Sequence, residues 1–152
     1  MNRFLSLILA LLLPLAAHAQ GGRERPPVTI LISIDGFRAD YLDRGITPNL
    51  SRLAAEGARG KLRPSFPTKT FPNHYAIVTG KRPDNHGIVG NNMIDPRRPD
   101  VRFSLGDPKQ SLDPFWWDEA EPAWVTAGKA GVRSATMFWP GSEVAIHAGR
   151  PA

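Results

Sequence analysis

The sequence of 152 residues contains no cysteine. This absence excludes disulfide bonds, thiolate metal sites and a cysteine nucleophile, so stability must come from a hydrophobic core or from bound metal. The chain also has no apolar run of membrane-spanning length, because the run at 4–13 is shorter than the about 20 residues that a spanning helix needs. Its cations are scattered rather than arranged in a stripe with aromatic residues, which argues against binding of a nucleic-acid duplex.

The first 19 residues have the features of a secretory signal peptide. Arg3 precedes the apolar run, Pro14 ends it, and the small residues Ala17 and Ala19 follow. This order predicts cleavage after Ala19 and export to the periplasm or the extracellular space. Removal of residues 1–19 takes away one arginine and no acid, so the formal charge falls from +5 to +4. Such a mild positive charge suits an anionic substrate.

Residues 20–27 are polar and contain glycine and proline, which predicts a flexible leader. The run VTILISI at 28–34 is apolar and rich in β-branched residues, a composition typical of a strand buried on both faces of a parallel sheet. Because ligands bind at the carboxyl ends of strands in open α/β sheets, the next residue, Asp35, is a candidate site residue. The alternative is that Asp35 only caps the turn that it forms with Gly36.

The remainder of the chain alternates between helix and strand patterns. Thr47 and Pro48 open an amphipathic segment that Gly57 closes, and a short extended piece follows at 60–63. The periodic pattern ends at Thr79, and residues 83–92 are rich in Gly, Asn and Asp, which predicts a loop. Residues 95–114 are polar, contain proline and show no clear period. This order predicts an α/β fold, with part of a mostly parallel sheet flanked by helices. The expected elements are helices at 48–56, 70–79 and 122–129 and a second buried strand at 132–138.

The stretch from Ser65 to Pro96 is centred on Thr70. This hydroxyl residue stands just before Pro72 and an apolar run that is typical of the first turns of a helix. A helix N-terminus offers free N–H groups and the positive end of a dipole, so it favours an anion such as phosphate. The alternative is that Thr70 serves only as the N-cap of its helix.

Asp35 and Thr70 are separated by 35 residues, a distance in sequence that one strand, helix and strand crossover can close in space. A divalent cation between a carboxylate and a hydroxyl would lower the pKa of the hydroxyl and make an alkoxide nucleophile accessible. His74 and His86 are possible metal ligands or structural hydrogen-bonding residues, and His147 is a weaker candidate.

Four strings of the sequence together resemble one known family. The strings are IDGFRADYL, PTKTFPNHY, VTGKRPDNHGIVGNNM and FWPGSE. They resemble the nucleotide pyrophosphatase/phosphodiesterase family of the alkaline phosphatase superfamily, from about residue 28 to residue 150. The resemblance implies that 28–152 form the N-terminal part of a catalytic domain with an alkaline-phosphatase-like α/β fold and a two-zinc phosphodiesterase site.

The resemblance also implies a role for each matching residue. Asp35 corresponds to a ligand of one zinc ion, and Thr70 to the residue that both binds this zinc and attacks phosphorus. Asn91 corresponds to the donor of a hydrogen bond to a non-bridging phosphate oxygen. Phe71 falls where members that act on nucleotides place an aromatic ring against the base, and Lys69 is a candidate phosphate contact.

The family takes its other zinc ligands from sequence beyond these motifs, and no residue after Asn92 supplies them. The final residues, VAIHAGRPA, include no closing helix or strand, so we expect a fragment that is inactive by itself. The expected substrate is a small nucleotide or another phosphodiester. The alternatives are a phosphomonoesterase of the same superfamily and a non-catalytic remnant that binds phosphate or metal. A sulfatase with a cysteine-derived nucleophile is excluded because cysteine is absent.

Mass spectrometry of exported protein tests the signal peptide. We expect the mature chain to begin at Gln20, because a small residue, Ala19, precedes it. An Ala19→Arg variant should remain unprocessed, since the cleavage site requires a small side chain. Soluble exported protein that retains Met1 would contradict the prediction.

Overall fold

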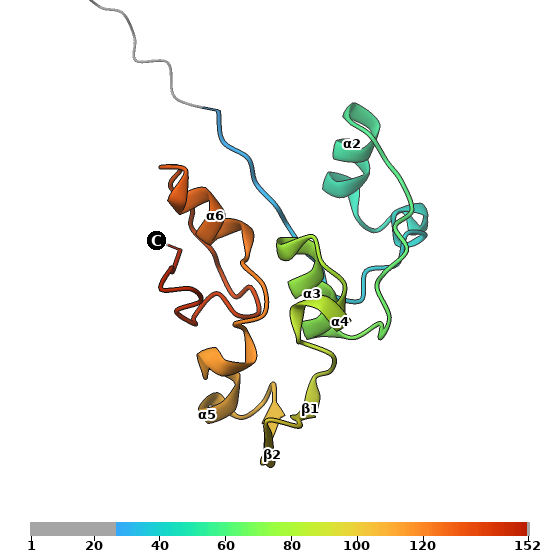
Figure 1. The fold of residues 1–152 in the computed structure, drawn as a ribbon. Helices are drawn as coiled ribbons and strands as arrows, with labels where there is room; N and C mark the ends of the chain where they lie inside the picture. Colours follow the sequence, from blue (N-terminus) through green and yellow to red (C-terminus); the bar gives the residue numbers. More distant parts are fainter. Residues whose placement is uncertain (1–26, 152) are drawn as a thin grey trace, which may run out of the picture. The chain divides into compact units, whose positions relative to one another are not determined.

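The computed structural model describes residues 27–151. The expected signal peptide at 1–19 and all but the last residue of the leader at 20–27 lie outside the described residues. The chain divides into two compact units, 1–34 and 35–152, and each is described by itself (Figure 1).

In the first unit, the apolar run at 28–34 is not a strand, contrary to the expectation from its sequence. Its large side chains are exposed, from 49% for Ile34 to 80% for Val28. A strand of a parallel sheet is stabilised by hydrogen bonds to neighbouring strands and by helices on both faces. No strand of residues 27–151 pairs with this run, so its β-branched composition alone does not produce a strand.

The second unit contains short helices and one hairpin (Figure 1). Strands β1 (Asn92–Asp95) and β2 (Arg98–Ser104) pair antiparallel, with a shift of register between Ile94 and Asp95. This hairpin is the sheet of the described residues. The helices are η2 (Tyr41–Arg44), α2 (Pro48–Glu56), α3 (Thr70–Thr79), α4 (Pro83–His86), α5 (Pro108–Ser111), η3 (Pro114–Trp116) and α6 (Ala123–Lys129).

The helices expected from local signals are confirmed. Helix α2 begins at Pro48 and is followed by Gly57, as proline and glycine at these positions predict. Helix α3 ends before Gly80, whose φ of 67° is in the left-handed region and whose N–H bonds to the carbonyl of Ala76. The third expected helix, at 122–129, is α6, whose N-cap is Pro122.

Four other expectations are wrong. The loop expected after Thr79 contains α4 and runs into β1, and the segment without a clear period contains β2 and α5. The expected strand at 132–138 and the extended piece at 60–63 form no strand in the structure. Val132 is 58% exposed and Phe138 is 89% exposed, so the run at 132–138, like 28–34, lacks the neighbours that would bury and pair it.

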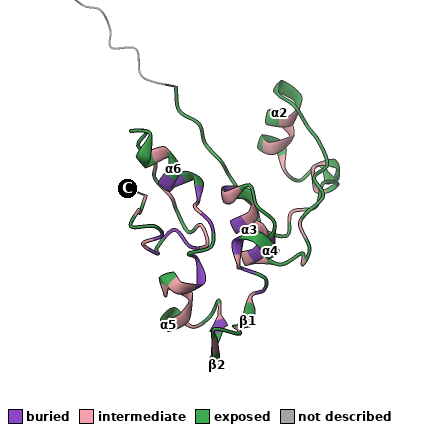
Figure 2. Cartoon of the chain, viewed as in Figure 1, coloured by how far each residue is buried: buried purple, intermediate pink, exposed green. Residues whose placement is uncertain are grey.

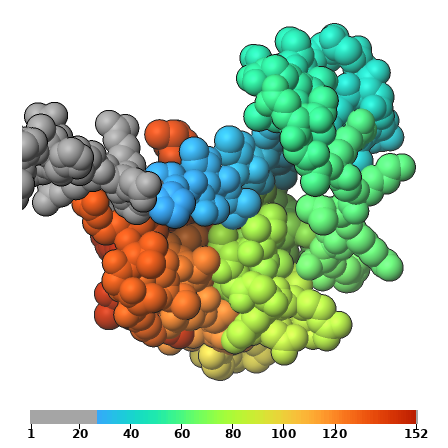
Figure 3. All heavy atoms as spheres, turned by 90° about the horizontal axis from the view of Figure 1, so that it is seen from above, coloured from blue at the N-terminus to red at the C-terminus, as the bar shows by residue number. Residues whose placement is uncertain are grey.

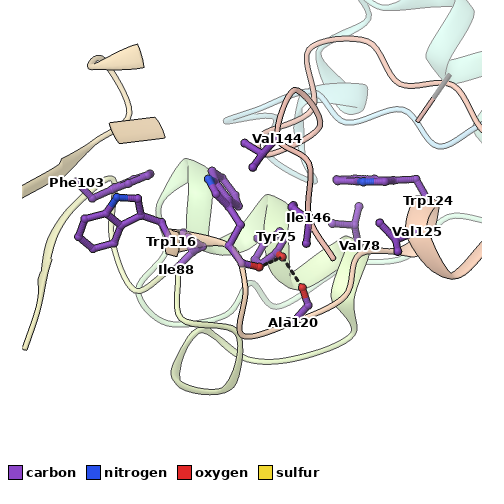
Figure 4. Packing of buried hydrophobic residues seen from close by; sticks show 11 residues of the cluster. Tyr75, Val78, Ile88, Phe103, Trp116, Ala120, Trp124, Val125, Val144 and Ile146 are labelled. Carbon is purple, nitrogen blue, oxygen red and sulfur yellow. Dashed lines mark hydrogen bonds between the residues drawn. The ribbon is translucent and has the colours of Figure 1, made fainter. Parts of the chain in front are cut away.

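The core of the second unit has five aromatic residues among its eleven members. Figure 2 shows buried segments on α3 and α6, and Figure 3 shows the residues of these two helices, in yellow-green and orange, in direct contact. Each fully buried large apolar side chain contributes about 1.5–3 kcal/mol, so a few rings account for much of the stability. The cluster comprises Tyr75, Val78, Ile88, Phe103, Trp116, Trp117, Ala120, Trp124, Val125, Val144 and Ile146 (Figure 4).

Tyr75 ties α3 into this core. Its hydroxyl oxygen lies 2.7 Å from the carbonyl oxygen of Trp117 and 2.6 Å from that of Ala120 (Figure 4). Burial holds the pKa of Tyr75 above its usual value, so the hydroxyl remains a donor. Gly141 lies against the ring of Trp117, because an added Cβ at this position would come within 2.7 Å of the ring. Only glycine fits there, because its φ of 86° is also left-handed.

Replacement of Tyr75 by phenylalanine should lower the free energy of unfolding by about 1–3 kcal/mol, because two buried carbonyls lose their donor. Denaturant unfolding measures this loss. The matched control is Tyr41→Phe, the only other tyrosine, whose hydroxyl forms no hydrogen bond within 27–151 and whose loss should change stability by less than about 0.5 kcal/mol. Equal unfolding midpoints for the two variants would contradict the assignment.

Candidate active site

The structure brings Asp35 and Thr70 together. The Thr70 hydroxyl donates a hydrogen bond to Asp35 Oδ2 at 3.0 Å, across the 35 residues that separate them. An ionised carboxylate can only accept, so the hydroxyl hydrogen points toward Asp35 and the oxygen lone pairs face elsewhere. Both groups are accessible, since Thr70 is half-buried and Asp35 is exposed. This pair is a hydroxyl nucleophile candidate held by a carboxylate.

Thr70 does not cap its helix, so the capping alternative is wrong. The N-cap of α3 is Lys69, which has an extended backbone and makes no side-chain cap. Thr70 is the first helical residue, and its hydroxyl bonds to Asp35 instead of a backbone N–H. The position at the positive end of α3 is as the sequence predicts.

The backbone N–H groups at the N-terminus of α3 are almost all accounted for. The N–H of Lys69 bonds to the carbonyl of Pro67 at 2.9 Å, and that of Phe71 bonds to Asn91 Oδ1 at 3.0 Å. Pro72 has no N–H. Among residues 27–151, nothing accepts from the Thr70 N–H, so the residue with the hydroxyl also carries the one open donor of this helix end.

Asn91 reaches this helix end from the loop before β1. Because its Oδ1 accepts from the Phe71 N–H, the Nδ2 end of the amide is left for another partner. The loop is tight, since an added Cβ on Gly90 would lie 2.8 Å from the carbonyl oxygen of Asn92. The structure therefore places a side-chain donor next to the backbone of the nucleophile candidate.

The two other predicted site residues flank Thr70. Lys69 is exposed, and its side chain belongs to the residue that precedes the helix. Phe71 is half-buried, and its ring lies 5.7 Å from the Trp117 ring and 6.0 Å from the Phe103 ring, centroid to centroid. The Phe71 ring is thus supported from the core side by two aromatic neighbours.

The histidines do not assemble a metal site. Both ring nitrogens of His86 bond to backbone, at Pro72 and Ile88, and burial lowers the pKa of this histidine, so it is a neutral structural residue. His74 Nδ1 lies 2.7 Å from the Thr70 carbonyl oxygen, and His147 Nε2 lies 3.0 Å from the Asp118 carbonyl oxygen. In the described part of the chain, no group of three or more His, Cys, Asp or Glu side chains could hold a metal ion.

Sequence reasoning missed Asn73, which lies on the first turn of α3. Its side chain bonds to the backbone of residues 65–69, the turn that leads into the helix. The signal was available, because asparagine is a poor helix former that competes for nearby backbone groups. Its position three residues after Thr70 marks it as a residue that shapes the start of α3.

Comparison with known proteins gives consistent results. The family described as type I phosphodiesterase / nucleotide pyrophosphatase matches residues 29–152. A pyrophosphatase/phosphodiesterase of Schizosaccharomyces pombe is 54% identical over 123 residues, which are 80% of this chain and 25% of that protein. Human ectonucleotide pyrophosphatase/phosphodiesterase family member 1 is 50% identical over 129 residues, which are 83% of this chain and 14% of that protein.

A solved structure supports the fold. Murine ectonucleotide pyrophosphatase/phosphodiesterase 5, an inactive threonine-to-alanine variant in complex with AMP, superposes with a TM-score of 0.73 and 42% identity, over 78% of this chain and 32% of that one. The chain thus spans a quarter or less of the two curated relatives and about a third of the murine structure. The resemblance inferred from the four motifs is confirmed. The chain belongs to the type I phosphodiesterase / nucleotide pyrophosphatase family and carries part of its alkaline-phosphatase-like α/β fold.

Proposed function

We propose that this chain carries the nucleophile of a hydrolase that cleaves phosphodiester or pyrophosphate bonds of nucleotides, and that Thr70 is this nucleophile. The observation that carries the proposal is the hydrogen bond from the Thr70 hydroxyl to Asp35 at the N-terminus of α3. Family membership gives the reaction class. The murine relative supports the role of a threonine, since its inactive form is a threonine-to-alanine variant.

Two donors at this helix end would bind the phosphate. Within residues 27–151 the Thr70 N–H and the Asn91 Nδ2 group have no acceptor, and both belong to residues that hydrogen bonds already fix in place. Donors that are fixed before the reaction stabilise the charge that develops on non-bridging oxygens without reorganisation. Lys69 adds an exposed positive charge beside them.

The reaction consists of two displacements at phosphorus. In the first, a bond forms from Thr70 Oγ to phosphorus while the bond to the leaving oxygen breaks, the leaving group takes the electron pair, and the hydroxyl proton passes to solvent. In the second, water forms a bond to phosphorus, the bond to Thr70 Oγ breaks, and the hydroxyl is restored. The product is a nucleoside monophosphate.

Asp35 and Thr70 are the residues that would hold a zinc ion. Their oxygen atoms lie 3.0 Å apart, close to the ~3.3 Å that separates two ligands on a tetrahedral zinc with bonds of about 2.0 Å. Zinc supplies positive charge that lowers the pKa of a bound hydroxyl and offsets the charge of the phosphate. The proposal includes a second zinc, as the family resemblance implies, with further ligands beyond the two oxygens present here.

The proposed substrate is a nucleotide because Phe71 follows the nucleophile directly. Its ring is half-buried, with Phe103 and Trp117 on the core side, so part of the aromatic surface remains available to a base. AMP in the murine relative is consistent with a nucleotide ligand.

Export is also part of the proposal. It rests on the signal-like sequence at 1–19, outside the described residues, and agrees with the names of the ectonucleotide relatives. Between residues 27 and 151 there is no helix long and apolar enough to cross a bilayer.

In the full-length enzyme that carries this sequence, Thr70→Ala should reduce turnover of a chromogenic nucleotide diester by at least about a thousandfold, and Thr70→Ser should retain part of the activity, because only the hydroxyl is required. Steady-state kinetics measures both. The matched control is Thr79→Ala at the other end of α3, where the hydroxyl bonds to the backbone of Tyr75, and we expect it to keep turnover within about threefold. A Thr70→Ala enzyme with activity near that of the control would refute the nucleophile assignment.

Phe71→Leu should raise the KM for nucleotide diesters about tenfold, since stacking of a base on an aromatic ring is worth about 1–3 kcal/mol. Leucine preserves apolar volume against Phe103 and Trp117, so the core is disturbed less than by alanine. A diester without a base, such as bis(p-nitrophenyl) phosphate, serves as the internal control and should show a nearly unchanged KM. Equal losses on both substrates would identify Phe71 as a packing residue only.

A further inference from the structure

The side chain of Asn73 makes four hydrogen bonds to the turn that precedes α3. Its Oδ1 accepts from the Ser65 N–H at 2.8 Å. Its Nδ2 donates to three carbonyl oxygens, those of Ser65 at 3.4 Å, Pro67 at 3.0 Å and Lys69 at 3.0 Å. One amide therefore contacts the start, the middle and the end of the turn at 65–69.

Only a side-chain amide satisfies this arrangement. Three carbonyl oxygens converge on Nδ2, so the group at that position must donate, and the Ser65 N–H faces Oδ1, so the group there must accept. Aspartate has the same shape but would place a second acceptor against the carbonyls. Leucine would remove all four side-chain hydrogen bonds and leave the Ser65 N–H without its acceptor.

Hydrogen bonds, rather than apolar packing, hold this turn. None of residues 65–69 is buried, and Phe66 is 90% exposed. The turn has two local bonds of its own, from the Lys69 N–H to Pro67 and from the Thr68 hydroxyl to Ser65 at 3.3 Å. Asn73 is the side chain that joins this turn to the helix, because its own backbone N–H also bonds to the Lys69 carbonyl at 3.2 Å.

The turn decides where the hydroxyl of Thr70 lies. Lys69 has an extended backbone, with φ −133° and ψ 161°, and Thr70 is the next residue. A change in the Lys69 dihedral angles would rotate the first residue of α3 and move its hydroxyl away from Asp35. Displacement of a reacting atom by about 1 Å can cost about a hundredfold in rate.

We propose that Asn73 is a positioning residue that aims the Thr70 hydroxyl and N–H by fixing the turn at 65–69. The inference rests on the proposed function of Thr70 as nucleophile. Asn73 acts through the backbone and touches neither substrate nor the reacting oxygen. Its loss lowers kcat, because the ground-state contacts that Asn91 and Phe71 would provide remain in place.

The test compares two substitutions of Asn73 in the full-length enzyme. Asn73→Asp keeps the shape and the acceptor but loses the donors. Asn73→Ser is a gentler change that can still donate to the Lys69 carbonyl one helical turn back. We expect kcat for a chromogenic nucleotide diester to fall about a hundredfold for Asp and about tenfold for Ser, with KM changed less than about threefold.

Stability is separated from positioning by two measures. Turnover is expressed per AMP-binding site, counted by calorimetry, so that unfolded protein does not contribute. Tyr75→Phe is the matched control, since it removes a buried hydrogen bond from the same helix without touching the turn, and we expect it to lower the melting temperature but to keep kcat per site. If Asn73→Asp does not fold, the comparison of Asn73→Ser with Tyr75→Phe decides the matter.

The outcomes distinguish the two proposals. An inactive Thr70→Ala enzyme together with Asn73 variants whose kcat per site is within about threefold of wild type would overturn the positioning role alone. The same holds if kcat per site falls as far in Tyr75→Phe as in Asn73→Ser. An active Thr70→Ala enzyme, or a wild-type enzyme that does not bind AMP, would overturn the proposed function itself.

Discussion

Proline at the third position of α3 removes one of the few N–H groups that a helix N-terminus can offer to a ligand. The N–H of Phe71 is taken by Asn91, and that of the residue before the helix is bonded within its own turn. Within 27–151 the Thr70 N–H is the donor that remains. An anion at this helix end would therefore contact the open N–H and the hydroxyl of the same residue, Thr70. The site depends on the presence of both groups on one residue.

The rest of α3 packs into the aromatic core, which supports this helix end. Tyr75, one turn further on, is fully buried and bonded to the carbonyls that follow η3. Trp139 donates from its indole N–H to the His74 carbonyl and packs edge-on against the His74 ring. Trp117 packs against both Tyr75 and Phe71, so the core and the site share a ring. Sites built on elements fixed by packing keep their geometry better than sites on free loops.

What the sequence could predict depended on the range of the interaction. The helices at 48–56 and 70–79 follow from residues inside or beside them, because Pro48, Gly57 and Gly80 act on their own backbone. Strand formation needs a partner that the run itself does not contain. The runs at 28–34 and 132–138 have the composition of buried strands, yet no strand of the described residues pairs with them.

The predictions of site residues also depended on whether the interaction was local or distant. Asp35 and Thr70 were predicted to meet through a strand, helix and strand crossover. They do meet, although the runs at 28–34 and 60–63 that would supply the two strands form none. The residue type of Asn73 indicates only that it bonds to nearby backbone. Which groups it bonds to depends on where three carbonyl groups of the turn converge, and this cannot be predicted from the type. For His86 the sequence left two alternatives, a metal ligand or a structural hydrogen-bonding residue, and the second is confirmed because both its ring nitrogens bond to backbone groups.

The string TFPNHY is specific because its residues meet separate requirements of one helix start. A cap needs a single side chain that accepts a single N–H, and many residues can provide it. Here Thr70 bonds to a distant carboxylate, Asn73 holds the preceding turn and Tyr75 enters the core. Thr70 and Asn73, three residues apart, lie on the same side of the helix and act at its N-terminus, whereas Tyr75 points from another side into the core. The helix does not need the Thr70 hydroxyl for capping, and neighbours with separate roles hold this hydroxyl in place. The hydroxyl therefore remains available for chemistry.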